Sequence, residues 1–100
     1  MNVISKRGLI QLAKVKRIDG DTMNELVAWY QEARHTSWTN LLDVWREFPT
    51  ADQVGAVIVF NFRHNRYRLI ARAEFSKQLM FVKALLNHKE YDGEDWKKWA

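Results

Sequence analysis

The chain contains no cysteine, only one proline and only four glycines among its 100 residues. Without cysteine it can form neither a disulfide scaffold nor a thiolate metal site, which agrees with a reducing compartment such as the cytoplasm. A hydrophobic content of 47% argues against a disordered chain. No apolar run approaches the length of a membrane span and the first residues lack the apolar core of a signal peptide, so we expect no membrane partner.

The common motifs of catalysis and metal binding are also missing. There is no glycine-rich phosphate loop, no G-x-S-x-G and no H-E-x-x-H. The three histidines, His35, His64 and His88, do not have the spacing of metal ligands, so we predict no metal site and no cofactor. Any chemistry must therefore come from histidine, tyrosine and the basic side chains.

What the chain does have is enough length for one domain and an excess of positive charge. One hundred residues predict a single domain, 1–100, with one modest core. Sixteen Lys and Arg against twelve Asp and Glu give a formal net charge of +4. A basic balance on a small domain suggests a polyanion or an acidic partner.

Residues 56–91 predict an antiparallel meander of three strands. Two short polar joints, 63–65 and 76–77, divide this stretch into apolar, β-branched or aromatic runs of strand length. Residues 64–65 suit the centre of a two-residue turn, because Asn65 tolerates a positive φ. The predicted pairs are Ile58–Ala71, Phe60–Leu69, Asn61–Arg68, Phe62–Tyr67, Ala73–Met80, Ala71–Val82, Leu69–Ala84 and Tyr67–Leu86.

Alternation of side chains along these strands predicts one apolar face and one mixed, cationic face. The apolar face carries Ile58, Phe60, Phe62, Tyr67, Leu69, Ala71, Ala73, Met80, Val82, Ala84 and Leu86. The mixed face carries Asn61, Arg66, Arg68, Arg72, Glu74 and Lys83 among Val57, Val59, Ile70, Leu79, Phe81 and Leu85. We expect helices on the apolar face and an anion on the cationic one. Residues 96–99, or a partner segment, should cover some of the apolar side chains on the mixed face.

The first half of the chain predicts three helices, and residues 2–4 an additional strand. In the second helix, apolar residues at the spacing i, i+3, i+4, i+7 predict a buried stripe of Met23, Leu26, Val27 and Tyr30. The predicted helices begin at caps Ser5, Asp21 and Ser37, and the third ends before Pro49. The expected fold class is α+β, with N-terminal helices packed on one face of a small antiparallel sheet.

Three side chains near the end of the meander could carry chemistry on RNA. Cleavage without metal needs a base for the 2′-OH, an acid for the leaving oxygen and cations for the phosphorane charge. Arg68 lies centrally on the cationic face, and arginine bonds two phosphate oxygens at once. His88 and Tyr91 follow the last strand closely, and histidine suits acid or base work near neutral pH. Each also fits a plain structural role on a solvated strand, in a loop or at the sheet edge.

Several segments resemble the HigB-type toxins of the RelE-like superfamily: M-N-V-I-S, E-F-P-T-A-D, V-F-N-F-R-H-N-R-Y-R-L-I and H-K-E-Y-D. The N-R-Y-R-L stretch followed by H-x-E-Y-D is the most specific of these. The resemblance implies a bacterial type II toxin that cuts mRNA on the translating ribosome without metal. It also implies neutralisation by a HigA-type antitoxin with a helix-turn-helix domain.

On this resemblance we assign catalytic roles to Arg68, His88 and Tyr91, with base and acid left open. The surrounding polar residues are expected to bind RNA: Asn61, Arg66, Arg72, Lys77 and Lys83. RelE-like enzymes differ in their catalytic residues, so Lys83 or Arg72 could matter as much as His88. Two other functions fit the same sequence, namely a ParE-like toxin that inhibits DNA gyrase by protein contact and a non-catalytic RNA- or ribosome-binding module.

Overall fold

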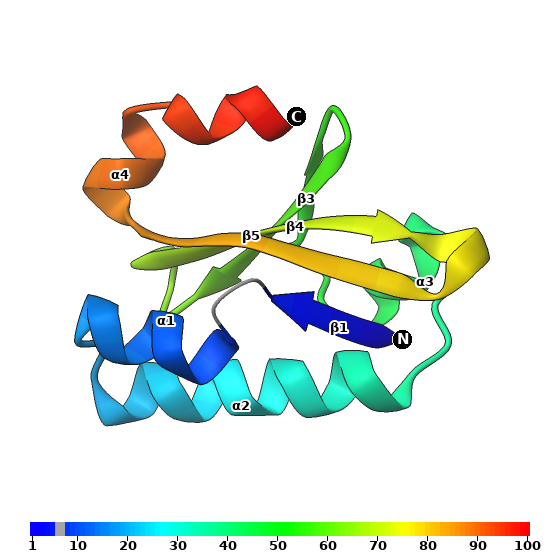
Figure 1. Cartoon of the computed structure of the whole chain (residues 1–100), viewed down its shortest axis with the longest axis horizontal. Coiled ribbons are helices and arrows are strands. Elements are labelled where there is room, and N and C mark those ends of the chain that lie inside the picture. Colours follow the sequence, from blue (N-terminus) through cyan, green and yellow to red (C-terminus); the bar gives the residue numbers. More distant parts are fainter. Residues whose placement is uncertain (6–7) are drawn as a thin grey trace.

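The computed structural model of the chain describes residues 1–5 and 8–100. It confirms an α+β fold, with α1 and α2 on one face of a five-stranded sheet and the C-terminal helices on the other (Figure 1). The strand order is β1-β5-β4-β3-β2, and all neighbours are antiparallel except β1, which pairs parallel to β5. The elements are β1 Asn2–Ser5, α1 Leu9–Lys16, α2 Gly20–His35, α3 Leu41–Glu47, β2 Asp52–Val54, β3 Val57–Phe62, β4 Tyr67–Glu74, η1 Phe75–Lys77, β5 Leu79–Asn87, α4 His88–Asp92 and η2 Asp95–Trp99.

The first predicted hairpin, β3–β4, is confirmed pair by pair. Asn61 lies opposite Arg68, Phe62 opposite Tyr67 and Ile58 opposite Ala71. His64 and Asn65 take positive φ values of 53° and 74°, as the two-residue turn requires. This hairpin fixes the position of Arg68 at the centre of the sheet.

The second hairpin, β4–β5, is predicted correctly only as far as Ala71. Ala71 pairs with Val82, but Ile70 pairs with Ala84, so Lys83 is an extra residue in β5. An inserted residue of this kind moves every later side chain to the other face. The predicted pairs Leu69–Ala84 and Tyr67–Leu86 are therefore wrong, since Leu69 faces Leu85 and Tyr67 faces Asn87.

This bulge also corrects the two predicted faces. Leu85, expected on the mixed face, is 1% exposed in the core beneath the helices. Ala84 and Leu86, which were expected in that core, pack instead with Val57, Val59, Ile70 and Trp96 on the opposite face. Around the bulge, the helices therefore pack on the large Leu85 side chain, and the opposite face carries the half-buried Ala84 and Leu86.

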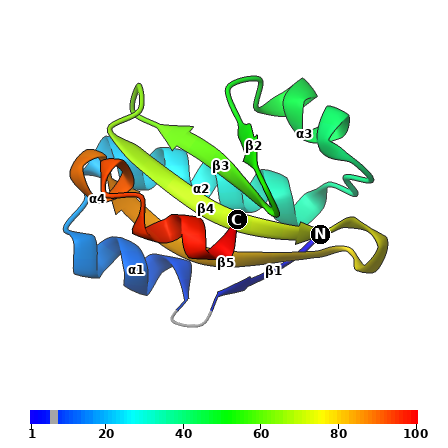
Figure 2. The ribbon, with the colours of Figure 1, turned by 90° about the horizontal axis from the view of Figure 1, so that it is seen from above.

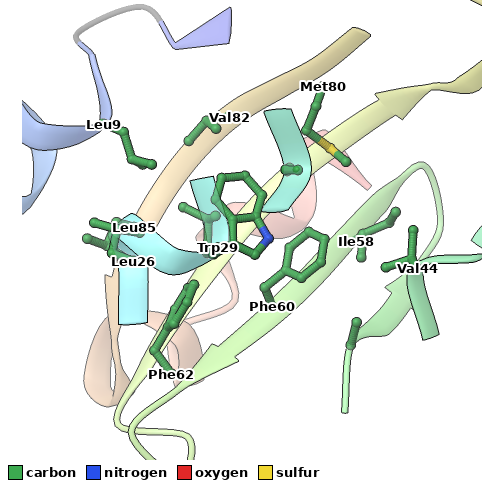
Figure 3. Packing of buried hydrophobic residues seen from close by; sticks show 14 of the residues in the cluster. Leu9, Leu26, Trp29, Val44, Ile58, Phe60, Phe62, Met80, Val82 and Leu85 are labelled. Atoms are coloured by element: carbon green, nitrogen blue, oxygen red, sulfur yellow. The ribbon is translucent and has the colours of Figure 1, made fainter. Parts of the chain in front are cut away.

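The core between the helices and the sheet is built around Trp29 (Figure 3). Its indole ring meets Phe60 edge-on with ring centroids 5.2 Å apart. The buried residues of α2 are Thr22, Leu26, Trp29 and Ala33. Val27 is 40% exposed, so the buried stripe of α2 has the predicted helical period but lies on a neighbouring face of the helix, the one that carries Trp29.

The predicted caps of the three helices are wrong. Ser5 belongs to β1, α2 begins one residue before Asp21, and α3 begins at Leu41 rather than near Ser37. The residue that caps α3 is Asn40, whose side chain accepts a hydrogen bond from the Asp43 N–H at 3.1 Å. Trp38, predicted to be helical, lies in the irregular segment before α3 and is 1% exposed.

The C-terminal segment covers the other face of the sheet (Figure 2), as expected for residues 96–99. Val57, Val59 and Ile70 are fully buried beneath it, and Trp96 is 3% exposed. The last residue, Ala100, reaches the β2–β3 turn, where a Cβ on Gly55 would lie 2.6 Å from its carbonyl carbon. Among the helices of the described residues, none combines the length and the apolar character needed to cross a bilayer.

Candidate active site

Arg68, Tyr91 and Trp96 form a stack on the face covered by the C-terminal segment. The Arg68 guanidinium carbon lies 4.2 Å from the centre of the Tyr91 ring. The same ring stacks on Trp96, with ring centroids 4.9 Å apart and planes 10° from parallel. A cation over an aromatic face is held electrostatically and by packing, so the stack fixes the direction of the guanidinium.

Tyr91 reaches Arg68 because α4 begins immediately after β5. Asn87 and Glu90 form a capping box, in which the Glu90 N–H donates to the Asn87 side chain and the Asn87 N–H donates to the Glu90 carboxylate. This stretch, expected to be a loop from its sequence, is therefore helical. One helical turn later Tyr91 lies back over the sheet, and the Trp96 Nε1–H donates to its carbonyl oxygen at 2.9 Å.

The charge of Arg68 is not neutralised within the part of the chain that the structure describes. No carboxylate there forms an ion pair with it, and its Nε–H is buried without a hydrogen-bond partner. A half-buried arginine with free donors favours an incoming anion, because desolvation makes each new charged hydrogen bond stronger. The stack can therefore hold a phosphate.

His88 is adjacent to this stack but not part of it. It is the first residue of α4, three residues before Tyr91, and such pairs are neighbours on a helix surface. Its side chain is 69% exposed, and its Nε2 lies 3.1 Å from a carboxylate oxygen of Asp92. The structure thus brings Arg68 and Tyr91 together and leaves His88 at the margin, facing solvent.

The predicted RNA-binding residues extend along the β4–β5 hairpin rather than gathering at one point. Asn61 lies beside Arg68 and donates from Nδ2 to the Thr50 carbonyl oxygen at 2.7 Å. Arg66 is exposed in the turn before β4, whereas Lys77 is exposed at the opposite end of the hairpin. Arg72 pairs with Glu74 at 3.2 Å, and Lys83 projects from the bulge.

Trp96 is the residue of the stack whose place the sequence did not predict. It was expected to cover the sheet, which it does, but its stacking on Tyr91 depends on the tight turn at residues 93–94. Glu94 takes a positive φ of 62° there. A second aromatic residue shortly after Tyr91 was the only signal in the sequence.

As to metals, within the described ranges no three His, Asp or Glu side chains are grouped to hold a metal ion.

Glu90 also ties α4 to α1 through an ion pair with Lys16. Burial acts to raise the pKa of Glu90, but hydrogen bonds from Lys16 and from the Asn87 N–H outweigh it and hold the pKa below its ordinary value of 4.5. The ion pair therefore stabilises the fold above pH 4.5, and this contribution disappears as the pH falls through the lowered pKa.

Glu90→Gln tests this link, because glutamine can keep the capping box while it loses the charge. We expect a lower melting temperature at pH 7, equivalent to about 1 kcal/mol or less for a partly exposed pair. The difference from wild type should shrink progressively in thermal melts as the pH falls below 4.5 and through the lowered pKa of Glu90. Glu94→Gln, which removes an exposed partner of Lys97, is the control and should change little. A deficit that persists in acid would mean that packing, not charge, is lost.

Comparison with known proteins shows which family this chain resembles. The family model described as HigB toxin, the RelE-like toxic component of a toxin–antitoxin system, matches residues 22–94. The match includes Arg68, His88 and Tyr91 and ends just before Trp96. No curated protein sequence matches the chain.

Proposed function

Because the chain belongs to the HigB toxin family of RelE-like toxins, we propose that it is an endoribonuclease that cuts mRNA on the translating ribosome. The observation that supports this most is the Arg68 guanidinium, which is held against Tyr91 and forms no ion pair with any carboxylate of the described residues. Membership of the family implies an antitoxin partner. We extend this to a HigA-type antitoxin with a helix-turn-helix domain, and we place the single-domain toxin in the cytoplasm.

In the proposed reaction Arg68 binds the non-bridging oxygens of the scissile phosphate. A base takes the proton from the ribose 2′-OH, whose oxygen attacks phosphorus, and the bond to the 5′-oxygen breaks as an acid protonates that oxygen. The products are a 2′,3′-cyclic phosphate and a 5′-OH. Arg68 stabilises the charge that develops on the phosphorane, and His88 and Tyr91 supply the base and the acid. All groups in this scheme come from the protein, so no metal is required.

The polar residues of the hairpin would hold the RNA on either side of this centre. Arg66 and Asn61 lie next to Arg68, so they are placed to contact the nucleotides nearest the cut. Lys83, Arg72 and Lys77 lead away along β5 and β4 towards the other end of the hairpin. Contacts of this kind position a strand and do not read its sequence.

The test is primer extension on cellular mRNA after induction, comparing wild type with His88→Ala. New 5′ ends should accumulate with the wild type and fall by about 100-fold or more with His88→Ala if the imidazole acts as acid or base. His35→Ala, which removes an exposed histidine at the end of α2, is the matched control and should cut like the wild type.

Other outcomes point to other functions. Growth arrest with intact transcripts and a DNA damage response would replace the nuclease by a gyrase inhibitor. Salt-sensitive binding to ribosomes without any cut would replace it by a binding module. Normal cleavage by His88→Ala would leave the nuclease in place and remove His88 from its centre.

A further inference from the structure

A groove of about 560 Å³ opens on the helix side of the sheet, on the face opposite the Arg68 stack. It lies between α2, α3 and β3, and its floor is aromatic, made by Trp29, Phe48, Phe60 and Phe62. Its rim carries three carboxylates, Glu25, Glu32 and Glu47. On a protein of net charge +4, a concave surface whose charged lining residues are all acidic is a local reversal of the sign of the charge.

Two of these carboxylates face each other without a cation. Glu25 accepts a hydrogen bond from the Arg63 N–H at 2.9 Å, but among the described residues neither Glu32 nor Glu47 forms an ion pair. Burial raises the pKa of Glu47, and the hydrogen bond and negative charge of Glu32 raise it further. Two carboxylates in this arrangement repel each other when both are ionised, and a cation between them would relieve the repulsion.

Phe48 is the partly exposed aromatic residue of the groove floor, whereas the Trp29 indole is 0% exposed and its Nε1–H has no hydrogen-bond partner among the described residues. Figure 3 shows the indole nitrogen on the edge of the ring turned towards Phe60, which lines the groove. The Phe48 ring beside Glu47 lets an ammonium or guanidinium group that pairs with the carboxylates also make a cation–π contact.

An apolar surface continues from the groove onto α3. The Trp45 Nε1–H donates to the carbonyl oxygen of Ala51, a lining residue, at 2.7 Å. Trp45 is 39% exposed and Leu42, three residues earlier, 60% exposed. Exposed tryptophan and leucine beside a groove are typical of a surface that binds protein.

We propose that this groove is a docking site for the antitoxin, which inserts a lysine or arginine between Glu32 and Glu47 and packs apolar residues on Trp45 and Leu42. The proposal rests on the antitoxin partner that the family implies, and not on the cleavage reaction. RNA does not fit, because its phosphates would meet the same carboxylates. An antitoxin held here contacts the side of the sheet away from Arg68, and Asn61, which lines the groove and pairs with Arg68 in the sheet, is the residue shared with the RNA face.

The test measures the affinity of the full-length toxin for its co-expressed, purified antitoxin by calorimetry. Glu32→Gln combined with Glu47→Gln keeps the shape of the groove and removes its charge, and the dissociation constant should rise by about 30-fold or more. Ala28→Trp blocks the groove from an exposed position on α2 and should weaken binding similarly. Asp52→Asn combined with Asp95→Asn removes two exposed carboxylates elsewhere and is the matched control.

Each result supports or overturns the proposal. Support is a loss of affinity in both groove variants, near wild-type affinity in the control, and unchanged mRNA cleavage in all of them. An affinity within about 3-fold of wild type in both groove variants would overturn it, as would an equal loss in the control. Cleavage lost with antitoxin binding kept would assign the groove to the ribosome instead. A wild type that binds antitoxin but cuts no RNA would refute the proposed nuclease and leave the docking site standing.

Discussion

Arg68→Ala should reduce the rate of mRNA cleavage by about 100- to 1,000-fold, the usual effect of removing one group that stabilises transition-state charge. The guanidinium is half-buried, has no carboxylate partner among the described residues and is held 4.2 Å from the centre of the Tyr91 ring. Arg68→Lys keeps the charge but loses both the planar fork and the stacking, so its rate should lie between those of wild type and Arg68→Ala. The measurement is the single-turnover rate on programmed ribosomes.

Two comparisons make this result specific to the stack. Arg46→Ala removes an arginine of α3 whose side chain is 78% exposed and should cut at the wild-type rate. Retained antitoxin binding shows that Arg68→Ala still folds. If Arg68→Ala cuts normally while Arg72→Ala or Lys83→Ala does not, the catalytic centre lies further along the hairpin.

Trp96→Ala should lower the free energy of unfolding by about 3–5 kcal/mol, as expected for truncating a buried tryptophan. Trp96 is 3% exposed, packs with Val57, Val59 and Ile70, and stacks on the Tyr91 ring. Loss of that support should also free the Tyr91 ring, so cleavage should fall even where the protein is fully folded. Trp96→Phe keeps a ring but loses the hydrogen bond to Tyr91, at a cost of about 1 kcal/mol from that bond.

Urea unfolding measures this effect, with Leu42→Ala as the control because Leu42 is 60% exposed. A chain truncated before Glu94 should behave worse than Trp96→Ala, because it uncovers Val57, Val59 and Ile70 together and should aggregate. Unchanged solubility and antitoxin affinity of the truncated chain would mean that the tail does not protect the sheet.

The sequence predicted the first hairpin because two signals agreed there. Alternating apolar residues in β3 and β4 and a turn residue tolerant of positive φ, Asn65, allow one register only. In β5 the run from Val82 to Leu86 is apolar on both sides of Lys83, so alternation fits with or without an extra residue. The extra residue is present because it lets Leu85 pack into the core, and such packing cannot be predicted from the sequence of one strand alone.

Two of the predicted catalytic residues, Arg68 and Tyr91, lie together in the structure, while their roles in cleavage stay a prediction. That closeness depends on the direction of the chain after β5, which the capping box at Asn87 and Glu90 sets. The same helix turns His88 towards solvent and Asp92, a consequence of the 3.6-residue period that a loop does not have. Trp96 was expected to cover the sheet, but its stacking on Tyr91 was not predicted, because the turn at Glu94 has no clear sequence signal.

The most direct test of a protein-only cleavage centre at Arg68 is the chemistry of the cut ends. Purified toxin and programmed ribosomes are incubated, and the mRNA fragments of wild type and Arg68→Ala are analysed by end-specific ligation and mass spectrometry. We predict 2′,3′-cyclic phosphate or 3′-phosphate ends facing 5′-OH ends with the wild type, and about 100-fold fewer with Arg68→Ala. Ends carrying a 5′-phosphate, or equal cutting by Arg68→Ala, would contradict it.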